Sequence, residues 1–161
     1  MKTIEMMEIV RAAWSTVPAP PKDDMIWMDW DSGQDATLAL TGVAPMDVDI
    51  RSSGFSVATP LLDLPPRAAA AYLGTFLLSL LQGLEFQRVV GFFDDVITRA
   101  HTMTCLMDQN FWNDVIRKQL SPECQRAVES VAHHLVANRD VMVMDQKEVD
   151  ILLELATQSN K

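Results

Sequence analysis

The sequence predicts an all-α protein: a single compact domain of about six to seven helices, spanning residues 1–161, around a buried central helix over residues 66–82. Three observations support this fold class. Apolar residues recur at helical spacing along the chain, and several segments carry helix start and stop signals. Hydrophobic residues make up 48% and charged residues 22% of the sequence, which is typical of a folded globular protein. We find no internal repeat, low-complexity tract or domain boundary, and 161 residues is the length of one domain.

The central helix is the most apolar stretch of the chain. Pro66 fits the first helical turn, where an N–H donor is not needed, and Gly83 fits the left-handed position that ends a helix. Because no side chain between Arg67 and Glu85 carries a charge, we expect this helix to be buried on most sides. Its uncharged run is shorter than the ~20 residues of a membrane-spanning helix, so no membrane association is predicted.

Small residues repeat every four positions in this helix. Ala70 and Gly74 form one such pair, and Ala71, Thr75 and Ser79 form a second series. This spacing predicts a shallow face that another helix can approach closely. The approaching helix can belong to the same chain or to a second copy.

The segments before the central helix are shorter. Thr3 can cap the first helix, and Pro18 can end it. The residues from Phe55 to Leu62 predict a buried connection or a short strand. The pattern otherwise predicts a helix over 3–15, a rigid spacer over 18–21, a short helix over 34–41 and a helical turn over 45–51.

After the central helix, three segments carry helix caps. Asp108 can cap a helix, Ser121 is followed by a proline and an acid, and Asp145 with Glu148 forms the pattern of a capping box. The predicted elements are helices over 85–100, 109–119 and 122–137, a last helix from 146, and a loop over 101–107.

Several short motifs follow one another along the chain in an order that resembles a known family. They are Val17-Pro18-Ala19-Pro20, Gly42 to Asp47, Leu64-Pro65-Pro66-Arg67-Ala68, Tyr72-Leu73-Gly74-Thr75-Phe76-Leu77 and Leu120-Ser121-Pro122-Glu123-Cys124-Gln125. Up to about residue 137, the chain resembles a family of small, mainly helical bacterial proteins of unknown function. It departs from that family's pattern at Pro45, Pro65 and Arg67. The resemblance implies a mainly helical single domain and no established activity.

The net charge of −9 and the pI of about 4.6 bear on possible partners. An acidic surface disfavours nucleic acid and favours a basic protein partner. Residues 1–66 contain four basic and ten acidic side chains, whereas residues 67–161 contain nine and twelve. The N-terminus does not have the pattern of a signal peptide, so we expect a cytoplasmic protein with Cys105 and Cys124 as free thiols.

Catalytic and metal-binding patterns are scarce. No zinc-site, phosphate-loop, dinucleotide or nucleophile-elbow motif is present, so no cofactor or metal is predicted. An enzyme would need a Cys/His site assembled only by the fold, with Cys105, Cys124, His101 and His133 as candidates. Cys124 would lie in the first turn of a helix, where the thiol pKa can be lowered.

The most distinctive stretch is acidic and aromatic. Carboxylates beside exposed tryptophans suit recognition of a basic surface, although Trp27 and Trp30 can equally fold inward. We therefore favour a non-enzymatic acidic binding protein, of the immunity or antitoxin type, that inhibits a basic protein partner. The alternatives are the Cys/His enzyme and a structural or self-assembling module; the oligomeric state stays open. The predicted partner-binding residues are Asp23, Asp24, Trp27, Asp29, Trp30, Asp31, Asp35, Asp47 and Asp49.

Overall fold

The fold is seen in a computed structural model that describes residues 1–25, 40–48, 50, 61–92 and 96–158. All regular structure in these residues is helical, which confirms the predicted all-α class. The α-helices are α1 (Thr3–Trp14), α4 (Pro66–Val90), α5 (Val96–Leu106), α6 (Gln109–Phe111), α7 (Arg117–Gln119), α8 (Pro122–Ala137), α9 (Arg139–Met142) and α10 (Gln146–Thr157). Short 3-10 turns are η1 (Lys22–Met25), η2 (Pro45–Asp47) and η3 (Leu61–Asp63), and η4 (Trp112–Ile116) is a π-helical turn.

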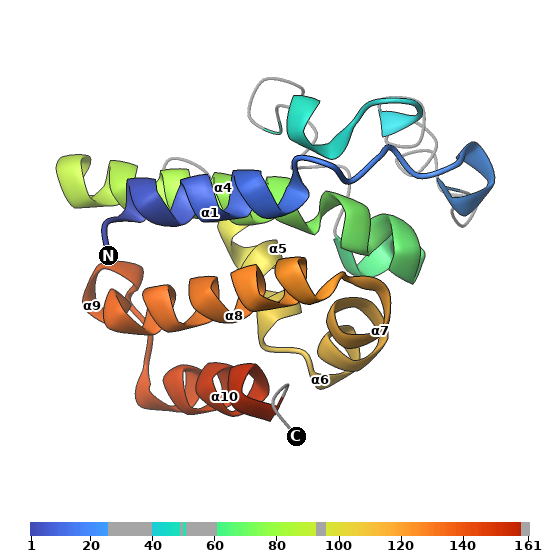
Figure 1. The fold of residues 1–161 in the computed structure, drawn as a ribbon. Helices are drawn as coiled ribbons and strands as arrows, with labels where there is room; N and C mark the ends of the chain where they lie inside the picture. The colour runs from blue at the N-terminus through green and yellow to red at the C-terminus, as the bar shows by residue number, and fades with distance from the viewer. Residues whose placement is uncertain (26–39, 49, 51–60, 93–95, 159–161) are drawn as a thin grey trace.

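The long helices pack as antiparallel neighbours. Figure 1 shows α1 running opposite to α4 and to α8, and α1 contacts both of them. α10 runs back along the other side of α8, while α5 packs against α4. The core therefore lies between α1, α4 and α8, and α4 contributes to it along most of its length.

The central helix is buried as predicted, but it is longer. Every residue from Ala68 to Leu77 is buried. The predicted end at Gly83 is wrong: the helix continues to Val90, and Gly91 ends it with a φ of 91°. Gly83 is buried inside the helix. Glycine permits the left-handed conformation without requiring it, so a glycine followed by helix-compatible residues does not stop a helix.

Because α4 is longer, the next predicted elements shift along the chain. The helix expected over 85–100 is divided between the end of α4 and the start of α5. The loop expected over 101–107 is wrong, since α5 continues to Leu106. The Thr102 hydroxyl donates to the carbonyl oxygen of Thr98 (2.7 Å), so this buried side chain is satisfied within the helix.

The shallow face of α4 is occupied by α1. Trp14 is fully buried, and a Cβ atom added to Gly74 would lie 2.4 Å from its ring. The Trp14 indole N–H also donates to the carbonyl oxygen of Ala70 (3.3 Å). The close approach predicted from the small residues is thus made within this chain, and Ala70 and Gly74 are covered by it.

The helix caps follow the sequence in most cases. Asp108, Ser121 and Asp145 each accept a backbone N–H in the first turn of their helices, as predicted. The predicted cap at Thr3 is wrong, because Thr3 lies inside α1 and its side chain is buried. The expected helical turn over 45–51 is described only as the short η2, and the expectations for 34–39 and 55–60 lie outside the described residues.

One helix is long and apolar enough to cross a membrane by length and composition. It is α4, with a mean hydropathy of 1.3 over its most apolar window. Within the fold, 78% of that window is buried, as in the core helix of a globular domain.

Candidate functional site

Three of the nine predicted partner-binding residues lie in the described part of the chain. Asp23 in η1 and Asp47 in η2 are exposed, and Asp24 is half-buried. The other six lie outside the described residues: Trp27, Asp29, Trp30, Asp31, Asp35 and Asp49.

Asp24 has a role within the fold. Its carboxylate lies 3.1 Å from the guanidinium of Arg67, in the first turn of α4. Both side chains are partly in solvent, so the pair contributes little stability, of the order of 0–1 kcal/mol. Its effect is positional: it ties η1 to the start of α4 beside the exposed Asp23.

The segment that carries Asp47 is held on α4 by two hydroxyl groups. The Tyr72 hydroxyl lies 3.0 Å from the carbonyl oxygens of both Leu40 and Val43. One turn further along α4, the Thr75 hydroxyl donates to the carbonyl oxygen of Pro45 (2.6 Å). These bonds satisfy backbone acceptors of a loop, and they hold the backbone that leads to Asp47 against α4.

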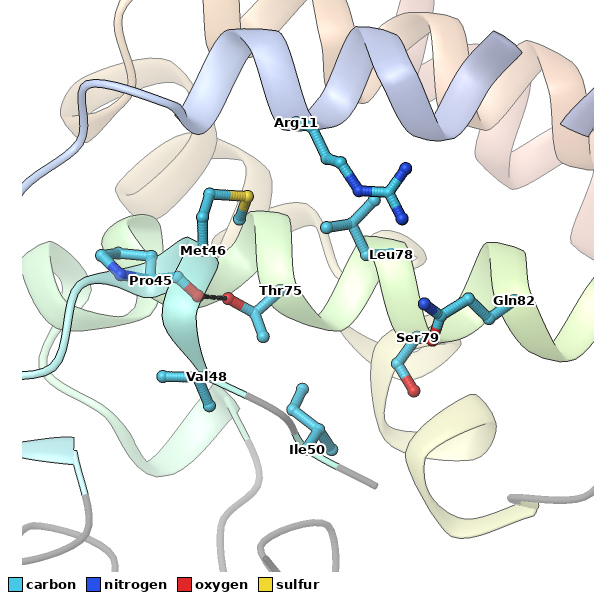
Figure 2. Close-up of a pocket in the computed structure, with 9 residues that line it drawn as sticks. All are labelled: Arg11, Pro45, Met46, Val48, Ile50, Thr75, Leu78, Ser79 and Gln82. Carbon is cyan, nitrogen blue, oxygen red and sulfur yellow. Dashed lines mark hydrogen bonds between the residues drawn. The ribbon is translucent and has the colours of Figure 1, made fainter. Parts of the chain in front are cut away.

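A pocket of about 370 Å³ opens between this segment, α1 and α4. Figure 2 shows Arg11 reaching toward Leu78 from α1, with Ser79 and Gln82 next to each other on α4. The η2 side of the pocket is apolar. Its lining residues are Arg11, Pro45, Met46, Val48, Ile50, Thr75, Leu78, Ser79 and Gln82.

Among the described lining residues, Arg11 is the one that carries a formal charge. The Arg11 side chain is exposed, and no hydrogen bond or ion pair joins it to another residue in the described ranges. Ser79 is buried and Gln82 is half-buried. The sequence did not predict this pocket. The available signal was the spacing of Thr75, Ser79 and Gln82, which places three polar residues of the uncharged stretch between Arg67 and Glu85 on one face.

A second hollow, of about 430 Å³, lies where the proline-rich segment passes the start of α8. Its only cation among the described lining residues is Arg67, which is already paired with Asp24. The exposed Glu123 also lines it. This hollow therefore attracts an anion less strongly than the pocket at Arg11 does.

The candidate cysteines are both buried free thiols. Cys124 donates its S–H to the carbonyl oxygen of Ala13 (3.1 Å), so it helps join α8 to α1. Burial raises its pKa above the usual value, with Glu123 adding to the effect and the hydrogen bond to Ser121 opposing it. This corrects the lowered pKa expected for a thiol at a helix start, since burial outweighs the favourable helix end.

The histidines are separated by their environments. His101 is half-buried on α5, and His133 is exposed on α8. His134 is buried, and its Nε2 lies 3.1 Å from the Thr3 hydroxyl, which joins the end of α8 to the start of α1. Burial lowers the pKa of His134, and the nearby Arg88 and N-terminus lower it further, while Glu85 raises it. His134 therefore has a structural role, because it links α8 to α1.

In the part of the chain that the structure describes, no three His, Cys, Asp or Glu side chains gather closely enough to hold a metal ion. Comparisons with protein-family models, curated proteins and solved structures give no match for this chain. The resemblance to the family of small helical bacterial proteins therefore stays a prediction.

Proposed function

We propose that this protein is a non-enzymatic binding domain for a basic protein partner, in the manner of an immunity protein or antitoxin that neutralises its target. The observation that carries the proposal is the way the acidic front part of the chain is attached to the core. Asp23 and Asp47 are exposed, yet each stands on a short 3-10 turn that contacts the buried helix α4.

The attachment preorganises the backbone that carries these two carboxylates. Asp24, the neighbour of Asp23 in η1, is paired with Arg67. Thr75 donates to the carbonyl oxygen of Pro45, two residues before Asp47 in η2. A binding segment whose backbone is already positioned loses less conformational entropy on binding, so more of the interaction energy appears as affinity.

The overall charge supports the same class of partner. The chain carries a net charge of −9, of which −6 belongs to residues 1–66. A field of this sign attracts a basic protein from solution, and it accelerates association more than it strengthens the final complex. Inhibitors that must capture a toxic target quickly benefit from such steering.

The experiment is affinity capture from the native host with the tagged protein, followed by identification of the retained proteins. We expect a basic partner that is retained at low salt and whose association rate falls as salt is raised. D23K and D47K should each weaken its binding, and together they should weaken it more than tenfold. D140K is the matched control, because Asp140 is an exposed carboxylate on α9 at a distance in sequence from the proposed surface.

Two results would contradict the proposal. The first is a captured partner that is acidic, or binding that is indifferent to salt. The second is a partner whose affinity responds to D140K but not to D23K or D47K, since the binding surface would then lie elsewhere.

A further inference from the structure

We propose that the pocket between α1, α4 and the η2 segment binds a small amphipathic monoanion, namely a carboxylate with a short apolar tail. This proposal does not rest on the proposed function, although the pocket borders the acidic surface, because Met46 and Val48, which line it, flank Asp47 in sequence. It is inferred from three properties of the pocket: one guanidinium without a carboxylate partner in the described residues, a polar strip on α4, and apolar walls opposite.

The guanidinium of Arg11 provides the site for the carboxylate. Its planar fork matches the two oxygens of a carboxylate and binds them with two parallel charge-assisted hydrogen bonds. Because no ion pair joins Arg11 to another described residue, the ligand would not have to displace a carboxylate from the described part of the chain. Gln82, on the neighbouring turn of α4, offers an amide N–H₂ donor at the same side of the pocket (Figure 2).

The opposite walls suit a short hydrocarbon chain. Val48 and Ile50 present branched aliphatic groups on the side away from Arg11, and Met46 presents a flexible thioether that adapts to irregular shapes. Leu78, on α4 beside Arg11, adds a further aliphatic group. At about 370 Å³, the pocket is at the small end of the range for ligand sites, which favours a tail of a few carbons over a long acyl chain.

The same features disfavour other anions. Phosphate groups are usually held by backbone N–H groups at a helix start or by several cations. Here the α4 residues from Thr75 to Gln82 lie inside a continuous helix, so their N–H groups are used by the helix itself. A single arginine in a protein of net charge −9 selects a monoanion over a dianion, and it repels an amine.

The test is an NMR titration of the ¹⁵N-labelled protein with hexanoate, with 1-hexanol and hexylamine as ligands of matched length. We expect hexanoate to bind with a Kd near the millimolar range and to shift the amide signals around Arg11, Met46 and Gln82. The neutral alcohol should bind at least about tenfold more weakly, and the amine should not bind at the pocket.

Variants locate the site. R11Q should weaken hexanoate binding about tenfold while leaving the weak binding of 1-hexanol unchanged. R139Q is the matched control, because Arg139 is an exposed arginine on α9 and should leave the affinity for hexanoate unaltered. V48F, which places a ring in the apolar half of the pocket, should abolish the binding of both ligands.

The proposal is overturned if hexanoate causes no shifts at about 10 mM, if 1-hexanol binds as tightly as hexanoate, or if R11Q and R139Q have equal effects. Shifts confined to the exposed apolar residues near Val89 and Phe92 would also overturn it, since hexanoate would then bind an exposed apolar surface and not the pocket. Arg11 and Val48 are not in the fully buried core, and the dispersion of the amide spectrum shows directly whether each variant is folded.

Discussion

The indole ring of Trp14 lies directly against the backbone of Gly74, and no space for a methyl group separates them. An added Cβ atom would lie 2.4 to 2.8 Å from three ring atoms, a distance at which neighbouring groups must move. Trp14 is the last residue of α1, and Gly74 lies in the middle of α4. This contact limits how closely the end of α1 can approach the middle of α4.

We therefore expect G74A to destabilise the protein by about 2 kcal/mol, although alanine is the better helix former. Urea denaturation measures the change. In a W14L background the same substitution should cost less than about 1 kcal/mol, because the ring that meets the new methyl group is gone. Equal costs in the two backgrounds would show that the contact between Trp14 and Gly74 does not limit packing.

Tyr72 should titrate abnormally. It is the only tyrosine in the sequence and is 1% exposed, and burial raises its pKa from 10.0 to about 12. In the folded protein the tyrosinate absorbance should therefore rise with a midpoint near pH 12, and in denaturant it should rise near pH 10.

The same shift predicts a loss of stability at high pH. The unfolded chain releases the phenolic proton first, so the contribution of Tyr72 is complete below pH 10 and is lost as the pH rises through the folded value near 12. Y72F removes this dependence, and it also removes the hydroxyl that lies between the Leu40 and Val43 carbonyls. A wild-type titration midpoint near 10 under folding conditions would contradict the prediction.

His134 should make stability depend on pH near neutrality. Its pKa in the folded protein lies below the usual 6.5, mainly because the ring is buried. As the pH falls, the unfolded chain takes up the proton first, so stability is complete above about 6.5 and declines as the pH falls toward the folded value. Protonation would also remove the acceptor that the Thr3 hydroxyl contacts in one tautomer.

Urea unfolding at about pH 7.5 and pH 5.5 measures this dependence. H134Q should reduce the difference in unfolding free energy between the two pH values. H133Q, which alters the exposed histidine next to it in sequence, should leave the difference unchanged. A larger effect from H133Q than from H134Q would refute the assignment.

Val143 adopts a conformation that valine rarely takes. Its φ is 55°, and it follows α9 in the left-handed region, where the N–H of the next residue, Met144, donates to the carbonyl oxygen of Arg139 (3.0 Å). This is the hydrogen bond of a glycine-type helix end. Its side chain is 73% exposed, so little packing compensates for the strain.

V143G should therefore stabilise the protein by about 0.5–1 kcal/mol, which is the relief of left-handed strain minus the extra entropy of glycine in the unfolded chain. V143A, which keeps the Cβ atom, should not give this gain. Thermal unfolding of both variants provides the comparison. A loss of stability in V143G would mean that the Val143 side chain stabilises the folded protein by more than its left-handed backbone conformation costs.

The sequence was informative wherever one residue reports on its own surroundings. Ser121 and Asp145 were identifiable as caps because the interaction that defines a cap spans only three residues. The burial of α4 was predictable for a similar reason, since an uncharged stretch must avoid water on most sides.

Predictions were wrong where one residue type is compatible with two different positions in or beside a helix. Gly83 and Gly91 both permit a helix to end, but only Gly91 does so. Thr3 can cap a helix, yet it lies inside α1, where its hydroxyl contacts His134 across 131 positions of sequence. A local pattern contains no information about a partner that distant.

The chain's own sequence thus determined its helical class, its buried middle helix, its negative charge and most of its helix starts, because these depend on composition and on neighbours a few residues apart. Only the tertiary structure decided that Trp14 fills the gap at Gly74 and that Arg11, Met46 and Gln82 line one pocket. These arrangements depend on the close packing of helices from separate parts of the chain, and such packing is selected by the shapes of all the side chains together.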